Sequence, residues 1–180
     1  MKAILLIITL AASASCAVPT AVGTDFSEGQ IRFGARTAIA RSDATVDGSG
    51  YVLGNIFALD GGMFLTDQLE LGATAELYKS EYDGQANAQL FTGFARYYLQ
   101  SEGNVRPFVL IGAGLYNADD GVGDIYRLGA GVSQFIADRT SFEISAEQQF
   151  STYVADSGVD DGRKLESDAV NVYLGMNIFF

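Results

Sequence analysis

Hydrophobic and polar residues alternate with a period of two through most of the chain from about Gln30 to the carboxyl terminus. The clearest case is the last eleven residues, where every second position from Val170 to Phe180 is apolar and the positions between them are mixed. A period of two places successive side chains on opposite faces of a β-strand. The segment therefore predicts a strand with one wholly apolar face and one semi-polar face, as a strand between lipid and a polar interior requires.

Seven further segments have the pattern of strands, with turn-rich sequence between them and no convincing helical period. They cover approximately 30–41, 50–60, 68–78, 88–100, 105–117, 124–136 and 140–153. The facing of 50–60 is ambiguous, because both of its alternating sets are apolar. Strands of about ten or more residues in an even number are typical of transmembrane barrels. We therefore predict an all-β fold, an eight-stranded antiparallel up-and-down transmembrane β-barrel.

The connections between these strands fall into two groups. Short turns are expected at 61–67, 101–104 and 137–139, after the second, fourth and sixth strands. Longer and more acidic loops are expected at 42–49, 80–85, 118–123 and 154–167. Short turns on one side and longer loops on the other are the outer-membrane arrangement, which predicts that both chain termini are periplasmic.

The amino terminus carries Lys2, an apolar run and then small residues, which is typical of a secretory signal peptide. The apolar run has about half of the ~20 residues that a membrane-spanning helix needs. We expect cleavage after Gly23, which would remove residues 1–23 and leave 24–180 as the outer-membrane β-barrel domain. The alternative is a lipoprotein signal in which Cys16 is lipidated and becomes the first mature residue.

Composition excludes several functional classes. Loss of residues 1–23 would leave 10 Lys and Arg against 22 Asp and Glu, which excludes nucleic acid as a favoured partner because phosphate binding requires clustered positive charge. The chain has no histidine, so histidine-based triads and histidine metal sites are excluded.

Oxygen-rich loops around 117–124 and 156–168 have ligands that suit Ca²⁺. Neither matches the twelve-residue calcium-loop pattern, so we predict no metal and no cofactor.

Charged residues on the interior face nearly cancel. Five arginines oppose four glutamates in the expected lumen, at Arg32, Arg36, Glu70, Glu76, Arg96, Arg106, Arg127, Glu143 and Glu147. Isolated charges in a confined interior are costly, whereas arginine and carboxylate pair in forked hydrogen bonds. An eight-stranded barrel is only wide enough for side chains to fill it. We therefore predict a lumen plugged by a charge network; the alternative for this network is a gated proton or ion path.

Glu143 and Glu147 both face inward and suggest, at first sight, an acid–base pair. Four residues along a strand span about 13 Å, which exceeds the separation usual for glycosidase carboxylates. We therefore predict that the protein is not an enzyme.

Several segments resemble the recurring segments of the small outer-membrane β-barrel domain family, relatives of the OmpA and OmpX barrels. These are Gly62–Ala73, Ala95–Tyr98, Arg106–Phe108 and Leu128–Val132. The resemblance covers nearly the whole of the expected mature chain and concerns fold far more than activity. It implies a location in the bacterial outer membrane, with outer-membrane lipid and lipopolysaccharide as surroundings.

The resemblance also implies a transient partner. In that family the barrel-assembly machinery recognises a terminal aromatic strand, which docks by edge pairing. The matching assembly signal here is Val172, Leu174, Met176, Ile178 and Phe180. We expect a monomeric integral outer-membrane protein with a structural or surface-interaction role. The alternative is a porin-like narrow channel or a binder for small or hydrophobic solutes.

Overall fold

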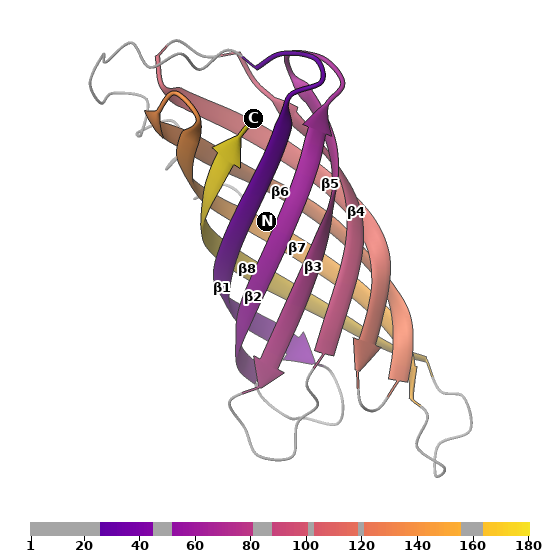
Figure 1. The fold of residues 1–180 in the computed structure, drawn as a ribbon. Coiled ribbons are helices and arrows are strands. Elements are labelled where there is room, and N and C mark those ends of the chain that lie inside the picture. Colours follow the sequence, from indigo (N-terminus) through magenta and orange to yellow (C-terminus); the bar gives the residue numbers. More distant parts are fainter. Residues whose placement is uncertain (1–25, 45–51, 81–87, 101–102, 119–120, 156–163) are drawn as a thin grey trace.

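The computed structural model describes residues 26–44, 52–80, 88–100, 103–118, 121–155 and 164–180. These residues form a closed barrel of antiparallel strands whose spatial order is the order along the chain (Figure 1). The strands are β1 (Ile31–Ala44), β2 (Val52–Phe64), β3 (Leu69–Ser80), β4 (Ala88–Tyr98), β5 (Val105–Ala118), β6 (Gly121–Ala137), β7 (Thr140–Ala155) and β8 (Lys164–Phe179). The predicted eight-stranded antiparallel barrel is confirmed. The expected signal peptide at residues 1–23, with Cys16, lies outside the described residues.

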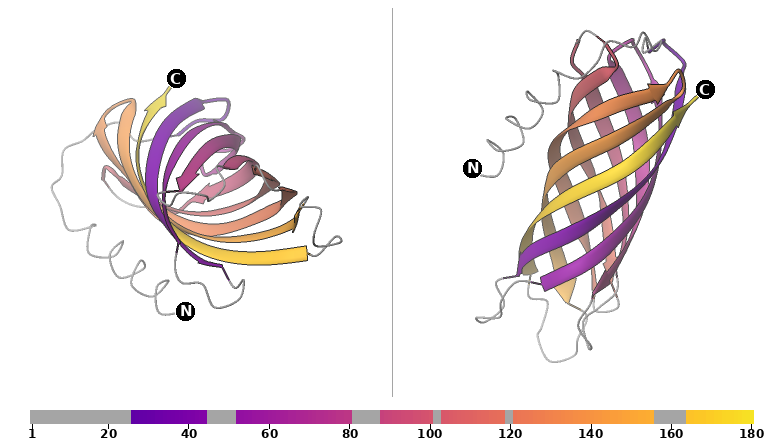
Figure 2. Two further views of the ribbon diagram at one scale, coloured as in Figure 1. Left: turned by 90° about the horizontal axis from the view of Figure 1, so that it is seen from below. Right: turned by 90° about the vertical axis from the view of Figure 1, so that its left-hand side faces the viewer.

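The barrel closes where β8 pairs with β1. Arg32 lies opposite Phe179 and Ala44 lies opposite Ser167 at the two ends of this pairing. Beyond β8, the backbone N–H of Phe180 donates to the carbonyl of Ile31 at 2.9 Å, and the N–H of Ile31 donates back at 3.1 Å. Each strand therefore has a hydrogen-bonded neighbour on both sides, so the wall has no open sheet edge. Figure 2 shows the tilted strands curling around one interior.

The two ends of the barrel differ in their connections. We call the end at which β2, β4, β6 and β8 finish the turn end; it is the upper end in Figure 1 and carries the connections 65–68, 99–104 and 138–139. The opposite end, which we call the loop end, carries the connections 45–51, 81–87, 119–120 and 156–163. The residues of these loop-end connections lie outside the described part of the chain.

Most strands run further than the sequence pattern predicted, most clearly β2, whereas β4 ends two residues earlier than expected. Gly61 and Gly62 were expected in a turn, yet they pair with β1 on one side and with β3 on the other. Gly62 faces the interior, where an added Cβ would lie 2.8 Å from Cγ of Glu70. The glycine makes room for a buried side chain and does not break the strand.

The two faces of the wall have opposite character. On the outer face of β8, Val172, Leu174, Met176, Ile178 and the following Phe180 are 43–64% exposed, whereas Asn171, Tyr173, Asn177 and Phe179 on the inner face are 1% exposed or less. The facing of β2, which the sequence left ambiguous, is settled by Leu59, which is exposed, and by Asp60, which is buried. No described helix is long and apolar enough to cross a membrane.

The barrel interior as the candidate functional site

The barrel interior contains most of the charged residues that the sequence analysis placed there. Five different strands supply eight of these residues, and each of the eight is 6% exposed or less: Arg32, Arg36, Glu70, Glu76, Arg96, Arg127, Glu143 and Glu147. Arg106, near the start of β5, differs from this group because it is only half-buried. Burial of so many charges is tolerated only where each charge has an opposite partner and further hydrogen bonds.

At the turn end of this group, Arg32 and Arg96 form neighbouring ion pairs, and both lie within 4.0 Å of Glu70. Nε of Arg32 lies 2.8 Å from Oε1 of Glu70, and Nη1 of Arg96 lies 2.8 Å from Oε2 of Glu143. Asn177 joins the two pairs, since its Oδ1 accepts from Nη1 of Arg32 at 2.6 Å and its Nδ2 donates to Glu143 at 3.0 Å. These contacts connect β1, β3, β4, β7 and β8 across the lumen.

Nearer the loop end, Arg127 of β6 and Glu76 of β3 form a forked pair. Their two nitrogen–oxygen distances are 2.5 and 2.6 Å, the bidentate geometry that gives arginine–carboxylate pairs their strength. The hydroxyl of Tyr173 donates to the same carboxylate at 3.3 Å. Arg36 extends the chain of contacts, because its Nη1 lies 2.6 Å from Oε1 of Glu147 and its Nη2 lies 3.9 Å from Oε1 of Glu76.

Asp60 of β2 is a member of this group that sequence reasoning missed. It accepts from Nε of Arg36 at 3.2 Å and forms an ion pair with Arg32, so it links the two arginines of β1. We refer to Asp60 and the eight buried charges above as the interior charge network. The fully buried part of the lumen therefore holds five carboxylates and four arginines. The sequence signal for Asp60 is the alternation that continues to Phe64. If Leu59 and Met63 face outward, the even-numbered residues between them face the interior, and Asp60 is one of these.

Aromatic rings contact two of the arginines in addition to their carboxylate partners. The guanidinium carbon of Arg96 lies 4.3 Å from the ring centroid of Phe108, and that of Arg36 lies 4.5 Å from the ring centroid of Tyr173. A guanidinium above an aromatic face is stabilised by the ring's quadrupole, most strongly where water is excluded. Phe108 is the contribution of β5, a strand that supplies no member of the interior charge network.

Space for these long side chains comes from glycine on the inner face. A Cβ at Gly175 of β8 would lie 2.6 Å from Cγ of Arg36. That separation is shorter than a carbon–carbon contact allows, so a residue with a side chain here would displace Arg36 and its pairs with Asp60 and Glu147. Inner-face glycines such as Gly175 therefore leave the space that the charged side chains of the network occupy.

Chemically, the interior charge network is a set of shared ion pairs in which five carboxylates meet four arginines. Each buried carboxylate of the described chain contacts an arginine: Asp60, Glu70, Glu76, Glu143 and Glu147. Within the described ranges no group of three or more Asp, Glu, Cys or His is arranged to hold a metal ion. The acidic loop positions Asp119, Asp120, Asp156, Asp160 and Asp161 lie outside those ranges.

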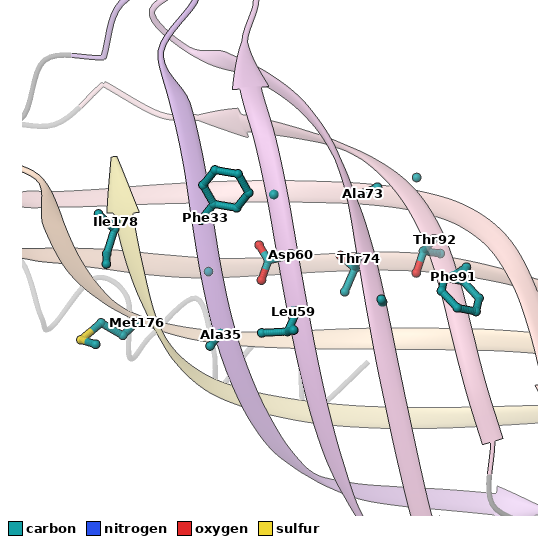
Figure 3. Close-up of a pocket in the computed structure, with 14 residues that line it drawn as sticks. Phe33, Ala35, Leu59, Asp60, Ala73, Thr74, Phe91, Thr92, Met176 and Ile178 are labelled. Atoms are coloured by element: carbon teal, nitrogen blue, oxygen red, sulfur yellow. The ribbon is translucent and has the colours of Figure 1, made fainter. Parts of the chain in front are cut away.

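A second feature is a groove of about 770 Å³ on the outer wall, which crosses β8, β1, β2, β3 and β4 (Figure 3). Small residues on its outward side are Ala35, Gly61, Ala73, Ala75 and Gly93. Large apolar residues beside them, 43–60% exposed, are Phe33, Leu59, Phe91, Met176 and Ile178. Asp60, Thr74 and Thr92 also line the groove but are 4% exposed or less. The groove therefore presents hydrocarbon and no catalytic group.

A closed, all-antiparallel barrel of eight strands, apolar outside and charged inside, is the architecture of the small outer-membrane β-barrels. No family model and no curated protein matches the sequence. Solved structures do match. Neisserial surface protein A aligns with a TM-score of 0.70 at 13% identity, covering 84% of this chain and 99% of that one.

Two further matches have the same fold. The N-terminal β-barrel domain of OprF from Pseudomonas aeruginosa aligns with a TM-score of 0.60 at 17% identity, covering 86% of this chain and all of that one. The outer membrane enzyme PagL aligns with a TM-score of 0.51 at 14% identity, covering 79% and 97%. The resemblance to small outer-membrane barrels is thus confirmed as a matter of fold. A fold shared between a surface protein and an enzyme does not by itself define an activity.

Proposed function

We propose that the protein is an integral outer-membrane barrel with a structural or surface-interaction role and a lumen closed by its own side chains. The observation that carries this proposal is the reversal of polarity across one wall: exposed hydrocarbon outside and nine buried, mutually paired charges inside. Such a wall is stable where its outside meets lipid, because an aqueous outside would leave a continuous apolar band exposed.

The closed lumen follows from the pairing. A conducting path needs water or mobile charge along its axis, whereas most of these arginines and carboxylates pair through the lumen between strands that are not neighbours in the wall. Nη1 of Arg36 on β1, for example, reaches Glu147 on β7 at 2.6 Å, and the Arg127–Glu76 pair joins β6 to β3. Opening a path would require several of these buried pairs to separate, at a cost of about 3–5 kcal/mol each.

The membrane part of the proposal is tested by electrophoresis. The full chain is taken from outer-membrane fractions, and boiled and unboiled samples are compared. A detergent-resistant barrel migrates differently before and after boiling. Identical mobility of the two samples, or recovery of the protein only in soluble fractions, would contradict an outer-membrane barrel.

The closed lumen is tested by planar-bilayer conductance of the purified protein. We expect no discrete openings from the native chain. A charge-removing variant, Glu76→Ala with Arg127→Ala, is the matched comparison, because it deletes the forked pair and leaves a smaller volume of side chain. Stable openings in the native protein would refute the closed lumen and favour the alternative of a narrow channel.

We further propose that the protein is not an enzyme. The outer membrane enzyme PagL shares the fold, so the support has to come from the residues. The chain has no histidine, and its buried carboxylates within the described ranges are all engaged by arginine. Imidazole and carboxylate groups are the commonest general bases, and a carboxylate held by arginine inside the barrel is not free to take a proton from a substrate.

The assembly signal is proposed to be the outer face of β8 together with Phe180, and the termini are proposed to lie on the periplasmic side. Phe180 is 64% exposed, and its ring and that of Phe33 form an edge contact with a centroid distance of 6.1 Å. The side chain thus lies on the outside of the β1–β8 seam, where a partner that docks on β8 can reach it. Deletion of Phe180 is expected to lower the membrane level of the protein far more than deletion of residues 156–163. Equal membrane levels of the two deletions would contradict the signal role.

A further inference from the structure

Four strands finish at the turn end of the barrel, and each presents an inward aromatic ring there. Phe64, Tyr98 and Phe179 are the last residues of β2, β4 and β8, and Phe135 lies just before the end of β6. All four are 2% exposed or less. The rings of Phe135 and Phe179 are 5.1 Å apart and those of Phe64 and Tyr98 are 5.5 Å apart, so the four rings form one layer across the mouth.

A fifth ring, that of Phe26, sits among these four, although Phe26 belongs to the segment that precedes β1. Its ring centroid lies 4.3 Å from that of Phe64 and 4.6 Å from that of Tyr98. The centroids of Phe179 and Phe135 are 5.5 and 5.7 Å away. Phe26 itself is only 7% exposed. It therefore contacts rings from the ends of four strands at once.

The backbone fixes Phe26 in this position. The N–H of Gln30 donates to the carbonyl of Ser27 at 3.0 Å, closing a turn in which Gly29 has φ +83°, a conformation that favours glycine. The N–H of Gly29 then donates to the carbonyl of Phe64 at 2.8 Å, and the N–H of Phe64 donates to the carbonyl of Gln30 at 2.9 Å. The segment is thus tied to β2 and turned so that Phe26 enters the mouth.

The aromatic layer lies directly against the interior charge network. Tyr98 belongs to both, since its ring contacts Phe26 and its hydroxyl donates to Oε2 of Glu70 at 3.2 Å. Glu70 in turn pairs with Arg32. Water that passed Phe26 would reach the Glu70–Arg32 pair first, where it would screen an interaction that is strong only in a dry surrounding.

We propose that Phe26 is a stopper: the segment before β1 places one aromatic side chain in the turn-end mouth and closes the lumen to solvent on that side. Solvent and small solutes then reach the interior only through the loop end. This inference rests on the fold and on the ring contacts. A native barrel that conducts ions would contradict both the closed lumen and the stopper, whereas a solvent-accessible residue 26 in a non-conducting barrel would contradict the stopper alone.

The position of the ring is tested with the variant Phe26→Trp. The chain contains no tryptophan, so the new indole is the single tryptophan reporter in the full-length protein. In lipid vesicles we expect it to be shielded both from iodide in solution and from brominated acyl chains. Phe33→Trp is the matched control, since Phe33 is 60% exposed on the outer wall and its replacement should be quenched by brominated lipid. Quenching of the residue-26 indole by iodide as strong as in the urea-unfolded chain would overturn the proposal.

The sealing action is tested with Phe135→Trp as the reporter. We expect its iodide quenching constant to rise several-fold when Phe26→Ala is added, to remain low with Phe26→Leu, and to remain low with Phe33→Ala. Phe26 lies outside the strands, so the barrel should still close in each variant, which the difference in gel mobility between boiled and unboiled samples verifies. If Phe26→Ala prevents closure, the Phe26→Trp and Phe26→Leu results decide the question. An unchanged quenching constant in a folded Phe26→Ala variant would refute the seal.

Discussion

The inner and outer faces of the barrel are built from the same eight strands but are held by different forces. In β3, Glu70 and Glu76 point inward and are 2% exposed or less, whereas Leu71 and Leu77 point outward and are 44% and 57% exposed. The glutamates need particular arginines at particular distances. The leucines need only an apolar surrounding, which any neighbouring hydrocarbon supplies.

This difference means that the inner face determines how the strands pair, whereas the outer face determines only that the surroundings must be apolar. A forked pair such as Arg127–Glu76 forms in a single register, because a slip of one residue would send every charged side chain to the outer wall. The outer wall tolerates exchange among apolar residues but excludes charge. Four experiments test this contrast, beginning with the largest expected effect.

Loss of one arginine from the interior should be the most damaging change. Arg96→Met would leave Glu143 and Glu70 buried near one positive charge fewer, so we expect the free energy of unfolding to fall by about 3–5 kcal/mol. Urea unfolding of the protein in lipid vesicles measures this change. Lys79→Met, at an exposed position of β3, is the control. A loss from Arg96→Met of under about 1 kcal/mol, the range of an exposed ion pair, would contradict a dry interior network.

Introduction of an arginine on the outer face should be nearly as damaging. Leu128 lies near the middle of β6 and is 52% exposed. Leu128→Arg is expected to cost about 2–4 kcal/mol if this position meets the centre of a bilayer. Leu128→Val, which keeps the face apolar, is the control in the same unfolding measurement. Equal stabilities of the two variants would show that the outer wall does not face lipid.

The forked pair should show strong coupling. Glu76→Leu and Arg127→Leu each leave one buried charge without its partner, whereas the double variant removes both charges. We expect the double variant to lose less than the sum of the single losses, with a coupling of about 1–3 kcal/mol in a double-mutant cycle. Glu76→Leu combined with Lys79→Met, on opposite faces of β3, should be additive. Additivity for Glu76 and Arg127 would contradict their pairing.

Two glycine substitutions give the smallest and most closely matched comparison. Gly175→Ala points a methyl group at Cγ of Arg36 and should cost about 1–3 kcal/mol through overpacking. Gly93→Ala points outward, where the nearest atom to the added Cβ lies 3.9 Å away, so its effect should stay within about 0.5 kcal/mol. If the two losses, read from unfolding midpoints, are equal, the inner face is less tightly packed than its distances indicate.

The sequence allowed a good prediction of the fold because the signal is repeated. Most segments pair an apolar outer set with an inner set that carries polar or small residues, and eight repetitions of a weak pattern outweigh the ambiguity of one segment such as 50–60. Positions such as Arg32, Glu76 and Glu143 were placed inside because an arginine or glutamate in lipid would be costly. Asp60 was missed for a local reason: the glycine pair after it looks like a turn when its neighbours in space are unknown.

Phe26 shows the limit of local pattern more clearly. It precedes the first strand, belongs to no alternation, and acquires its surroundings from residues as distant in sequence as Phe135 and Phe179. Contacts of that kind depend on where closed strands end in space, and a two-residue period contains no information about where strands end.

The alternation along β8, the clearest in the sequence, shows both what the sequence determines and what the tertiary structure decides. The sequence alone determined that β8 has an apolar face and a semi-polar face, because side-chain direction follows from the geometry of an extended backbone. Only the tertiary structure decided which partners the semi-polar face would meet: Asn177 between Arg32 and Glu143, Tyr173 on Glu76, and Phe179 against Phe26. Those partners come from other strands, and closure of the barrel is what brings them together.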